Sequence, residues 1–153
     1  MQTVEEKIKK LNSIGLTEYV GVIDIGIFLS SDANILYYLF PLIEKTVLEI
    51  LKFKYDTDVE VINQGKYRTL NSLIEIPKNR RHFSETVIKD LCIYFEDDGL
   101  RNKLMHYTPE LDELNIRISE ILKIKELTLT LLLKLGKLVS KSKIEMPGQI
   151  ELL

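Results

Sequence analysis

The sequence is poor in cysteine, in excess charge of either sign and in uninterrupted hydrophobic runs. Its single cysteine, Cys92, cannot form an intrachain disulfide, which favours a reducing, cytoplasmic location. The 21 basic and 23 acidic side chains give a net charge of -2, so the chain lacks the overall positive field of a protein that coats nucleic acid. Any contact with nucleic acid must therefore be local.

Two apolar passages have the length of a membrane span, but charged residues interrupt both. Residues 19–40 contain Asp24 and Asp32. Residues 116–139 contain Glu120, Lys123, Lys125, Glu126, Lys134 and Lys137. Charges at this density favour amphipathic helices over membrane spans. We therefore expect no membrane association. The polar amino terminus is not typical of a secretion signal.

Several common catalytic patterns are also missing. The sequence has no His/Cys or carboxylate cluster at metal-ligand spacing, no phosphate-binding glycine loop and no nucleophile elbow, so we expect neither a metal nor another cofactor. With 153 residues and 45% hydrophobic content, the chain is long enough for one domain with a real core. We assign residues 1–145 to that domain and residues 146–153, which begin Met-Pro-Gly, to a loose tail.

Apolar spacing predicts an all-α fold. Helical periodicity covers residues 3–12, and a largely apolar segment covers 17–29. Ser30 to Asp32 offers an amino-terminal cap for a helix that reaches about Lys54, in which Pro41 should produce a kink or a division. Residues 58–68 alternate around turn residues, which predicts a short hairpin or loop.

The second half of the sequence also contains patterns typical of helices, caps and turns. A short helix should end before Pro77, followed by an exposed basic loop at 78–82 and a helix capped by Ser84. The inward face of that helix is predicted to hold Val87, Ile88, Leu91, Cys92 and Phe95. Asp97-Asp98-Gly99 should break the chain.

Start signals at Thr108-Pro109-Glu110 predict a long last helix, weakened at Gly136 or Ser140. Its apolar side comprises Leu111, Leu114, Ile118, Ile121, Leu122, Leu129, Leu132 and Leu133. The sum is an up-and-down bundle of four to five main helices.

One short run concentrates catalytic residue types. Residues 99–107 read Gly-Leu-Arg-Asn-Lys-Leu-Met-His-Tyr, so that His106 lies five positions after Arg101, with four residues between them. A permanently charged guanidinium can hold a phosphate, and an imidazole can transfer protons near neutral pH. Five positions place the two residues about 140° apart on a helix. Either the helix begins inside the run, or the arginine's length brings its head back to the histidine.

This run closely resembles the Arg-x4-6-His signature of HEPN domains, which are all-helical modules that include many RNA-cleaving toxins and defence proteins. Residues 39–51 look like the earlier HEPN helix that packs beside the signature. The resemblance implies a metal-independent endoribonuclease, with Arg101 and His106 as catalytic residues. It also implies a homodimer with a composite site, 2',3'-cyclic phosphate and 5'-hydroxyl products, and a toxin–antitoxin or antiviral role with an antitoxin or regulatory partner.

Two residues are candidates for supporting the catalytic pair. Asn102 precedes His106 by one helical turn, where it could orient the ring, and an equal alternative is that it caps the signature helix. Glu44, in the passage that resembles the earlier helix, could pair with Arg101. We favour Glu44 as a solvated acid, because most helical glutamates are exposed.

Four more residues are candidates for binding RNA: Lys103, Tyr107, Arg80 and Arg81. Charged loops are usually solvated surface, and Tyr107 more often packs with its hydroxyl in water. Some HEPN toxins continue as His-x-Tyr, but here Tyr107 follows His106 directly and Thr108 occupies the matching place. Modification of that tyrosine by a partner enzyme is therefore not expected.

Two other functional classes stay open. One is a catalytically inactive HEPN-like module for dimerisation, RNA binding or partner docking, and the other is a helical regulator with no nucleic-acid role. In the plain structural interpretation, Arg101 pairs with Asp97 or Asp98 and His106 is a satisfied, partly buried side chain.

Overall fold

The computed structural model describes residues 3–13, 29–30, 32–54, 70, 74, 77–96, 98–106 and 116–145. Within these residues all regular structure is helical, which confirms the all-α class. The helices are α1 (Val4–Ser13), the 3-10 helix η1 (Ala33–Ile35), α4 (Leu36–Lys54), α7 (Pro77–Arg80), α8 (Glu85–Phe95), α9 (Leu100–His106) and α10 (Ile118–Glu145). The hairpin or loop predicted at 58–68 and the tail at 146–153 lie outside the described residues, as does nearly all of the apolar segment at 17–29.

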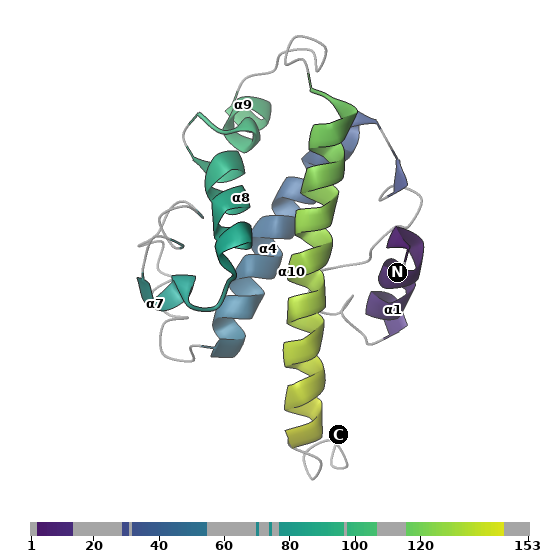
Figure 1. Ribbon diagram of the computed structural model, residues 1–153, viewed down its shortest axis with the longest axis vertical. Helices are drawn as coiled ribbons and strands as arrows, with labels where there is room; N and C mark the ends of the chain where they lie inside the picture. Colours follow the sequence, from purple (N-terminus) through teal and green to yellow (C-terminus); the bar gives the residue numbers. More distant parts are fainter. Residues whose placement is uncertain are drawn as a thin grey trace.

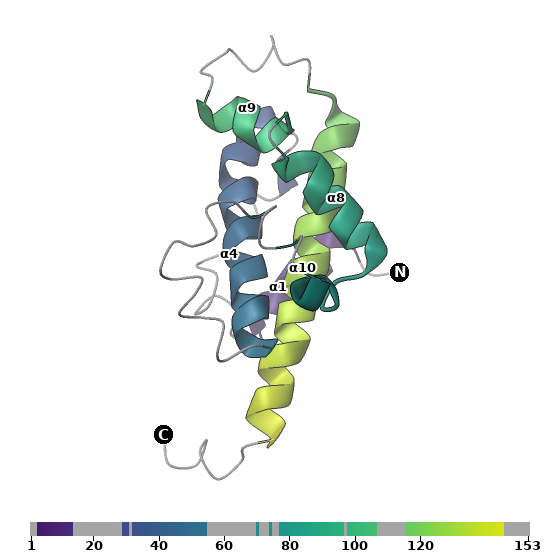
Figure 2. The ribbon, with the colours of Figure 1, turned by 90° about the vertical axis from the view of Figure 1, so that its left-hand side faces the viewer.

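Helices α4 and α10 form the centre of the bundle and run side by side in the same direction (Figures 1 and 2). Helix α8 runs in the opposite direction, and α1 lies on the other side of α10. Consequently the first turn of α4, the first two turns of α10, the last turn of α8 and the whole of α9 gather at one end of the molecule. We call this region the α9 end.

The core lies mainly where α4 and α10 face each other. Phe40 is fully buried, and its ring packs edge-on against Phe95 at a centroid distance of 5.5 Å and more loosely against Tyr94 at 6.3 Å. The largest fully buried side chains are Ile8, Leu36, Leu39, Phe40, Ile43, Ile50, Leu51, Ile74 and Leu91. Most of these side chains belong to α4, and since each stabilises a fold by about 1.5–3 kcal/mol, the packing around α4 fixes the positions of the helices.

Three buried polar side chains find acceptors within the bundle. The hydroxyls of Thr46 and Thr128 donate to the carbonyls of Leu42 and Ile124, one turn earlier in their helices. Lys125 is only 6% exposed, and its ammonium donates to a backbone carbonyl, that of Ser30. Burial lowers the pKa of Lys125, because desolvation penalises the charged form.

Pro41 does not divide α4, contrary to one of the two outcomes expected from the sequence. The helix is continuous from Leu36 to Lys54 with Pro41 inside it and exposed. A proline at this position removes a donor that would serve the carbonyl of Tyr37, which is itself at the exposed side of the helix. The buried neighbours Phe40 and Ile43 outweigh a cost of about 3 kcal/mol.

The last helix begins later than predicted. Ile116 and Arg117 are not helical, so α10 starts at Ile118, and the start signals at 108–110 lie outside the described residues. The helix also continues through Gly136 and Ser140, where weakening was expected. Ile118 and Leu122 were assigned to the inward side, but they are 63% and 54% exposed.

The predictions for α8 and the residues before it are confirmed only in part. Ser84 caps it as predicted, with its hydroxyl accepting from the Val87 amide at 3.3 Å. The inward face contains Tyr94, which the sequence pattern missed, whereas Cys92 is only half-buried. The expected basic loop is shorter, because Pro77–Arg80 forms α7 with proline at its first position, where the absent donor has no cost.

Local capping explains two other helix starts. Thr3 and Glu6 exchange side-chain to backbone hydrogen bonds of 3.1 Å at the start of α1, which is a capping box. Asp32 caps η1 by accepting from the Asn34 amide, so the predicted start of the long helix is confirmed.

No helix in the described part of the chain combines the length and the apolar character needed to cross a bilayer.

Candidate functional site

A tight turn at Gly99 positions α9. The Gly99 amide donates to the carbonyl of Glu96 at 2.8 Å, and its own carbonyl accepts from the Lys103 amide at 3.2 Å. A β-carbon at Gly99 would lie 2.6 Å from the carbonyl oxygen of Tyr94, which is closer than real contacts allow. Glycine is therefore required here by close backbone approach, and the turn sends the chain directly from α8 into α9.

The signature occupies nearly all of α9. The helix begins at Leu100, so Arg101 lies in its first turn and His106 is its last residue. Both residues therefore lie within one helix, about 140° apart around its axis. Neither of the two ways considered for bringing their side chains together is tested, because the His106 side chain lies outside the described part. Asn102 is the third residue of the helix and therefore does not cap it. The interaction of Asn102 with the imidazole stays a prediction, because the His106 side chain lies outside the described part.

Arg101 is held by an acid from the neighbouring helix. Its Nε donates to Oε1 of Glu44 in α4 at 2.7 Å, and its Nη1 donates to Oδ1 of Asn102 at 3.0 Å. The Arg101 and Glu44 side chains are 27% and 32% exposed. The favoured expectation for Glu44, a solvated acid, was wrong. The partner of Arg101 is Glu44 and not Asp98, and Asp97 lies outside the described residues.

The ion pair leaves the guanidinium available for another ligand. A guanidinium has five N–H donors, and the contacts with Glu44 and Asn102 use two of them, so three remain for other acceptors. The fixed side chain also loses rotational freedom before any ligand arrives. Arg101 is thus oriented and still partly open to solvent, which is the condition for binding a phosphate group with its fork.

The rest of α9 has one buried side and one exposed side. Leu104 is buried and Leu100 half-buried against the core, which anchors the helix. Lys103 and Met105 are exposed. Lys103 therefore has the accessibility that an RNA contact requires, whereas Tyr107 lies outside the described residues.

The structure does not bring Arg80 and Arg81 to the signature. Both are exposed, and they lie at the other end of α8, in and after α7 (Figure 1). Helix α8 has 11 residues, so its ends are separated by about 16 Å at 1.5 Å per residue. The two arginines therefore form a separate surface from Arg101.

A contact that the sequence analysis missed fixes the end of α8 beside the site. The Tyr94 hydroxyl donates to Oε2 of Glu120 in α10 at 3.0 Å. Burial raises the pKa of the Tyr94 phenol above its ordinary value of 10.0, and the hydrogen bond and charge of Glu120 add to the rise. The spacing of Tyr94 from Leu91 and Ile88 is helical, so apolar periodicity contained a signal for its burial.

Comparison with known proteins gives no relative. No protein-family model matches the chain, and no significant match is found among curated proteins or solved structures. Within the described residues, no group of three or more His, Cys, Asp or Glu side chains is placed to hold a metal ion.

Proposed function

We propose that the protein is a metal-independent endoribonuclease of the HEPN type that acts as a homodimer. The observation that carries the proposal is the arrangement of α9. Arg101 stands in its first turn, oriented by Glu44, and His106 ends the same seven-residue helix. The all-helical bundle is consistent with the fold that the signature implies.

The chemistry needs only these residue types and the RNA itself. A base removes the proton of the 2'-hydroxyl, whose oxygen attacks phosphorus while the bond to the 5'-oxygen breaks. An acid then protonates the leaving 5'-oxygen, which yields a 2',3'-cyclic phosphate and a 5'-hydroxyl end. His106 transfers protons, a role worth about 10² to 10⁴ in rate. Arg101 binds the scissile phosphate and stabilises its added negative charge.

Two proton transfers are better served by two imidazoles, which is why the proposal includes a dimer. Large apolar side chains are exposed on four helices of the α9 end, and exposed apolar side chains that gather in a patch often mark interfaces. They are Tyr37 in α4, Ile93 in α8, Met105 in α9, and Ile118 and Leu122 in α10. A second copy that docks at the α9 end would place two signatures near one two-fold axis.

The biological role proposed is toxin–antitoxin or antiviral defence in the cytoplasm, with RNA as substrate and an antitoxin or regulatory protein as a further partner. The single cysteine supports a reducing compartment. The resemblance of residues 99–107 to the HEPN signature supports the rest.

The test is cleavage of unstructured RNA by the purified protein in the presence of a chelator. Arg101→Ala and His106→Ala should each lower the rate by about 10²-fold or more, because each removes a group that acts in the transition state. Glu44→Gln keeps the shape of the acid and removes its charge. We expect an intermediate loss, with kcat affected more than KM, because Arg101 would be bound but poorly oriented.

Arg117→Ala is the matched control, since Arg117 is an exposed arginine immediately before α10, at the same end of the bundle. It should retain nearly full activity if the role of Arg101 is specific. Equal losses of cleavage rate in Arg101→Ala and Arg117→Ala would mean that Arg101 contributes only its positive charge and has no specific role at the scissile phosphate. Cleavage that survives Arg101→Ala or His106→Ala would contradict the proposal.

A catalytically inactive RNA-binding or docking module is the second candidate. The observation that favours it is the Glu44–Arg101 pair, because an arginine already matched by a carboxylate can be purely structural. Its signature would be RNA that shifts in a gel without being shortened.

A further inference from the structure

A groove beside α8 is lined by several cationic side chains. Its volume is about 490 Å³, and it is lined by Arg80, Arg81, Phe83, Glu85, Ile88, Lys89 and Cys92. We propose that this groove is a secondary binding site for single-stranded RNA, which holds the strand at a distance from the bond that is cut. The inference rests on the proposed function, since it names how the substrate would be held.

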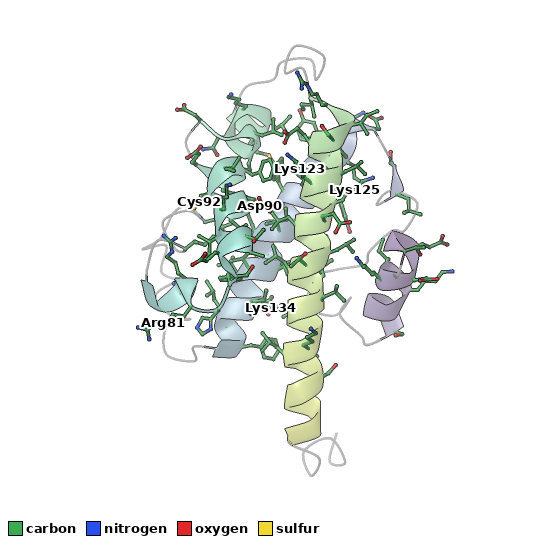
Figure 3. The ribbon with its side chains drawn as sticks, in the orientation of Figure 1. Arg81, Asp90, Cys92, Lys123, Lys125 and Lys134 are labelled. Atoms are coloured by element: carbon green, nitrogen blue, oxygen red, sulfur yellow. The ribbon has the colours of Figure 1, made fainter. Side chains whose placement is uncertain are left out.

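The shape of the groove follows from helical spacing. Glu85, Ile88, Lys89 and Cys92 fall at positions i, i+3, i+4 and i+7 and form one face of α8. Figure 3 shows Arg81 beside α7 and Cys92 further along α8, both on the side turned away from α10. The groove therefore runs along α8 in the direction of α9.

The charge of the groove complements a phosphate backbone. Arg80, Arg81 and Lys89 are exposed cations, and Glu85 is the one acid among the described lining residues, so the described part of the lining carries a net charge of +2 (three minus one). The whole chain has a net charge of -2, so this surface is positive against an acidic background. The floor of the groove is apolar, since it contains the side chains of Phe83, Ile88 and Cys92.

The length of α8 sets the length of RNA that can reach both sites. The span of about 16 Å corresponds to roughly five nucleotides at about 3.4 Å each in a stacked strand. A substrate of four nucleotides bound for cleavage at α9 should not reach the groove, whereas a twelve-nucleotide substrate should. The groove therefore predicts a dependence on RNA length that the cleavage site alone would not produce.

The experiment measures binding of a fluorescent twelve-nucleotide RNA that is 2'-O-methylated throughout, so that it cannot be cleaved. Arg80→Ala/Arg81→Ala should weaken binding roughly tenfold at moderate salt. The slope of log affinity against log salt should become less negative by about 1.4, which is 0.7 for each of two lost phosphate contacts. Glu85→Gln should change affinity in the opposite direction and tighten binding about twofold, because it removes an acid that would repel the phosphates.

Lys7→Ala/Lys9→Ala is the matched control, because it removes the same two charges from α1, on the far side of α10 (Figure 1). It should leave affinity within about twofold of the original. Equal weakening by the two double variants would overturn the inference and leave only a general charge effect. Displacement of the RNA by polyglutamate at equal charge would also overturn it, in favour of an acidic protein partner.

Cleavage kinetics separate this inference from the proposed function. In Arg80→Ala/Arg81→Ala, KM for an unmodified twelve-nucleotide RNA should rise, while kcat and the cleavage of a four-nucleotide RNA should not change. If the protein cleaves RNA and the variant binds and cleaves both substrates normally, the groove inference fails alone. If no RNA is cleaved but the methylated RNA still binds through Arg80 and Arg81, the nuclease proposal fails and the groove stands.

Discussion

The interface between α4 and α10 and the α9 end are built by different kinds of interaction. The interface is a continuous apolar core, whereas the α9 end is ordered by a few directed contacts between polar groups. These contacts are the Glu44–Arg101 pair, the Tyr94–Glu120 hydrogen bond and the turn at Gly99. Apolar burial is large and tolerant of small shifts, but directed contacts depend on distance and angle. Changes in the first region should therefore affect stability, and changes in the second should affect the geometry of the site.

Helix α4 belongs to both regions. Ile43 is fully buried in the core, and the next residue, Glu44, faces α9 and binds Arg101. The acid that orients the arginine is thus mounted on a helix whose position is fixed by packing. This arrangement orients the guanidinium relative to the packed core, which is what a preorganised phosphate site requires.

The largest stability effect is expected from Phe40→Ala. Phe40 is fully buried and packs against Tyr94 and Phe95, so its truncation should cost about 3–5 kcal/mol of the free energy of unfolding. Urea denaturation followed by circular dichroism measures the change. Because natural domains have only about 5–15 kcal/mol in total, the milder Phe40→Leu provides a folded comparison, with an expected loss of about 1–2 kcal/mol.

If the packing of Phe40 against Tyr94 and Phe95 does not set the geometry of the site, Phe40→Leu should retain RNA cleavage per folded molecule. A loss of cleavage greater than its loss of folded protein would show that the core and the site are coupled. A change of less than about 1 kcal/mol in Phe40→Ala would mean that the core around α4 is loosely packed.

Gly99→Ala should have the second largest effect on stability and a larger one on the site. The added β-carbon would meet backbone atoms of Tyr94 and Glu96 within 3.0 Å, and backbone cannot rotate away as a side chain can. We expect a loss of about 1–3 kcal/mol and a displaced start of α9, which would move Arg101 away from Glu44. The measurement is urea denaturation together with the cleavage rate.

Phe40→Leu is the control for Gly99→Ala, because the expected losses of stability overlap. At equal loss of stability, Gly99→Ala should lower cleavage by at least about tenfold more, since a misplacement of 1 Å in a catalytic group can cost about 10²-fold. Equal cleavage in the two variants would argue against a role for the turn in positioning Arg101.

The sequence predicted the parts of the fold that local chemistry determines. Asp32 and Ser84 cap helices because their side chains accept backbone amides within two or three residues. The break at Gly99 also follows from its own neighbourhood. What local patterns did not predict depends on distant parts of the chain. Pro41 stays inside a continuous helix because core packing outweighs its cost.

In the candidate site, too, the sequence predicted local features and missed contacts between residues that are distant in the chain. The sequence predicted a helix at the signature but left its start open, and the structure shows that α9 contains both Arg101 and His106. It did not favour Glu44 as the partner of Arg101, because the two residues are separated by 57 positions and helical glutamates are usually exposed. Ile118 and Leu122 were assigned to the core, yet they are exposed in the single chain. An apolar pattern cannot distinguish a side chain that faces its own core from one that faces a partner.

The smallest effect, and the finest test of the α9 end, is expected from Tyr94→Phe. The variant loses the hydrogen bond to Glu120 and keeps the buried ring, so the free energy of unfolding should fall by about 1–2 kcal/mol at neutral pH. The pKa of Tyr94 is raised in the folded protein, so the stability it contributes is complete below pH 10 and is lost as pH rises above the unfolded value of 10.0. Urea denaturation between pH 7 and about 11 should therefore show the difference between the two proteins shrinking above pH 10. The control is Tyr37→Phe, at an exposed tyrosine of the same end, which should change the free energy of unfolding by less than about 0.5 kcal/mol at every pH. A loss of stability in Tyr94→Phe that does not depend on pH would mean that the Tyr94 phenol is not buried against Glu120 in solution.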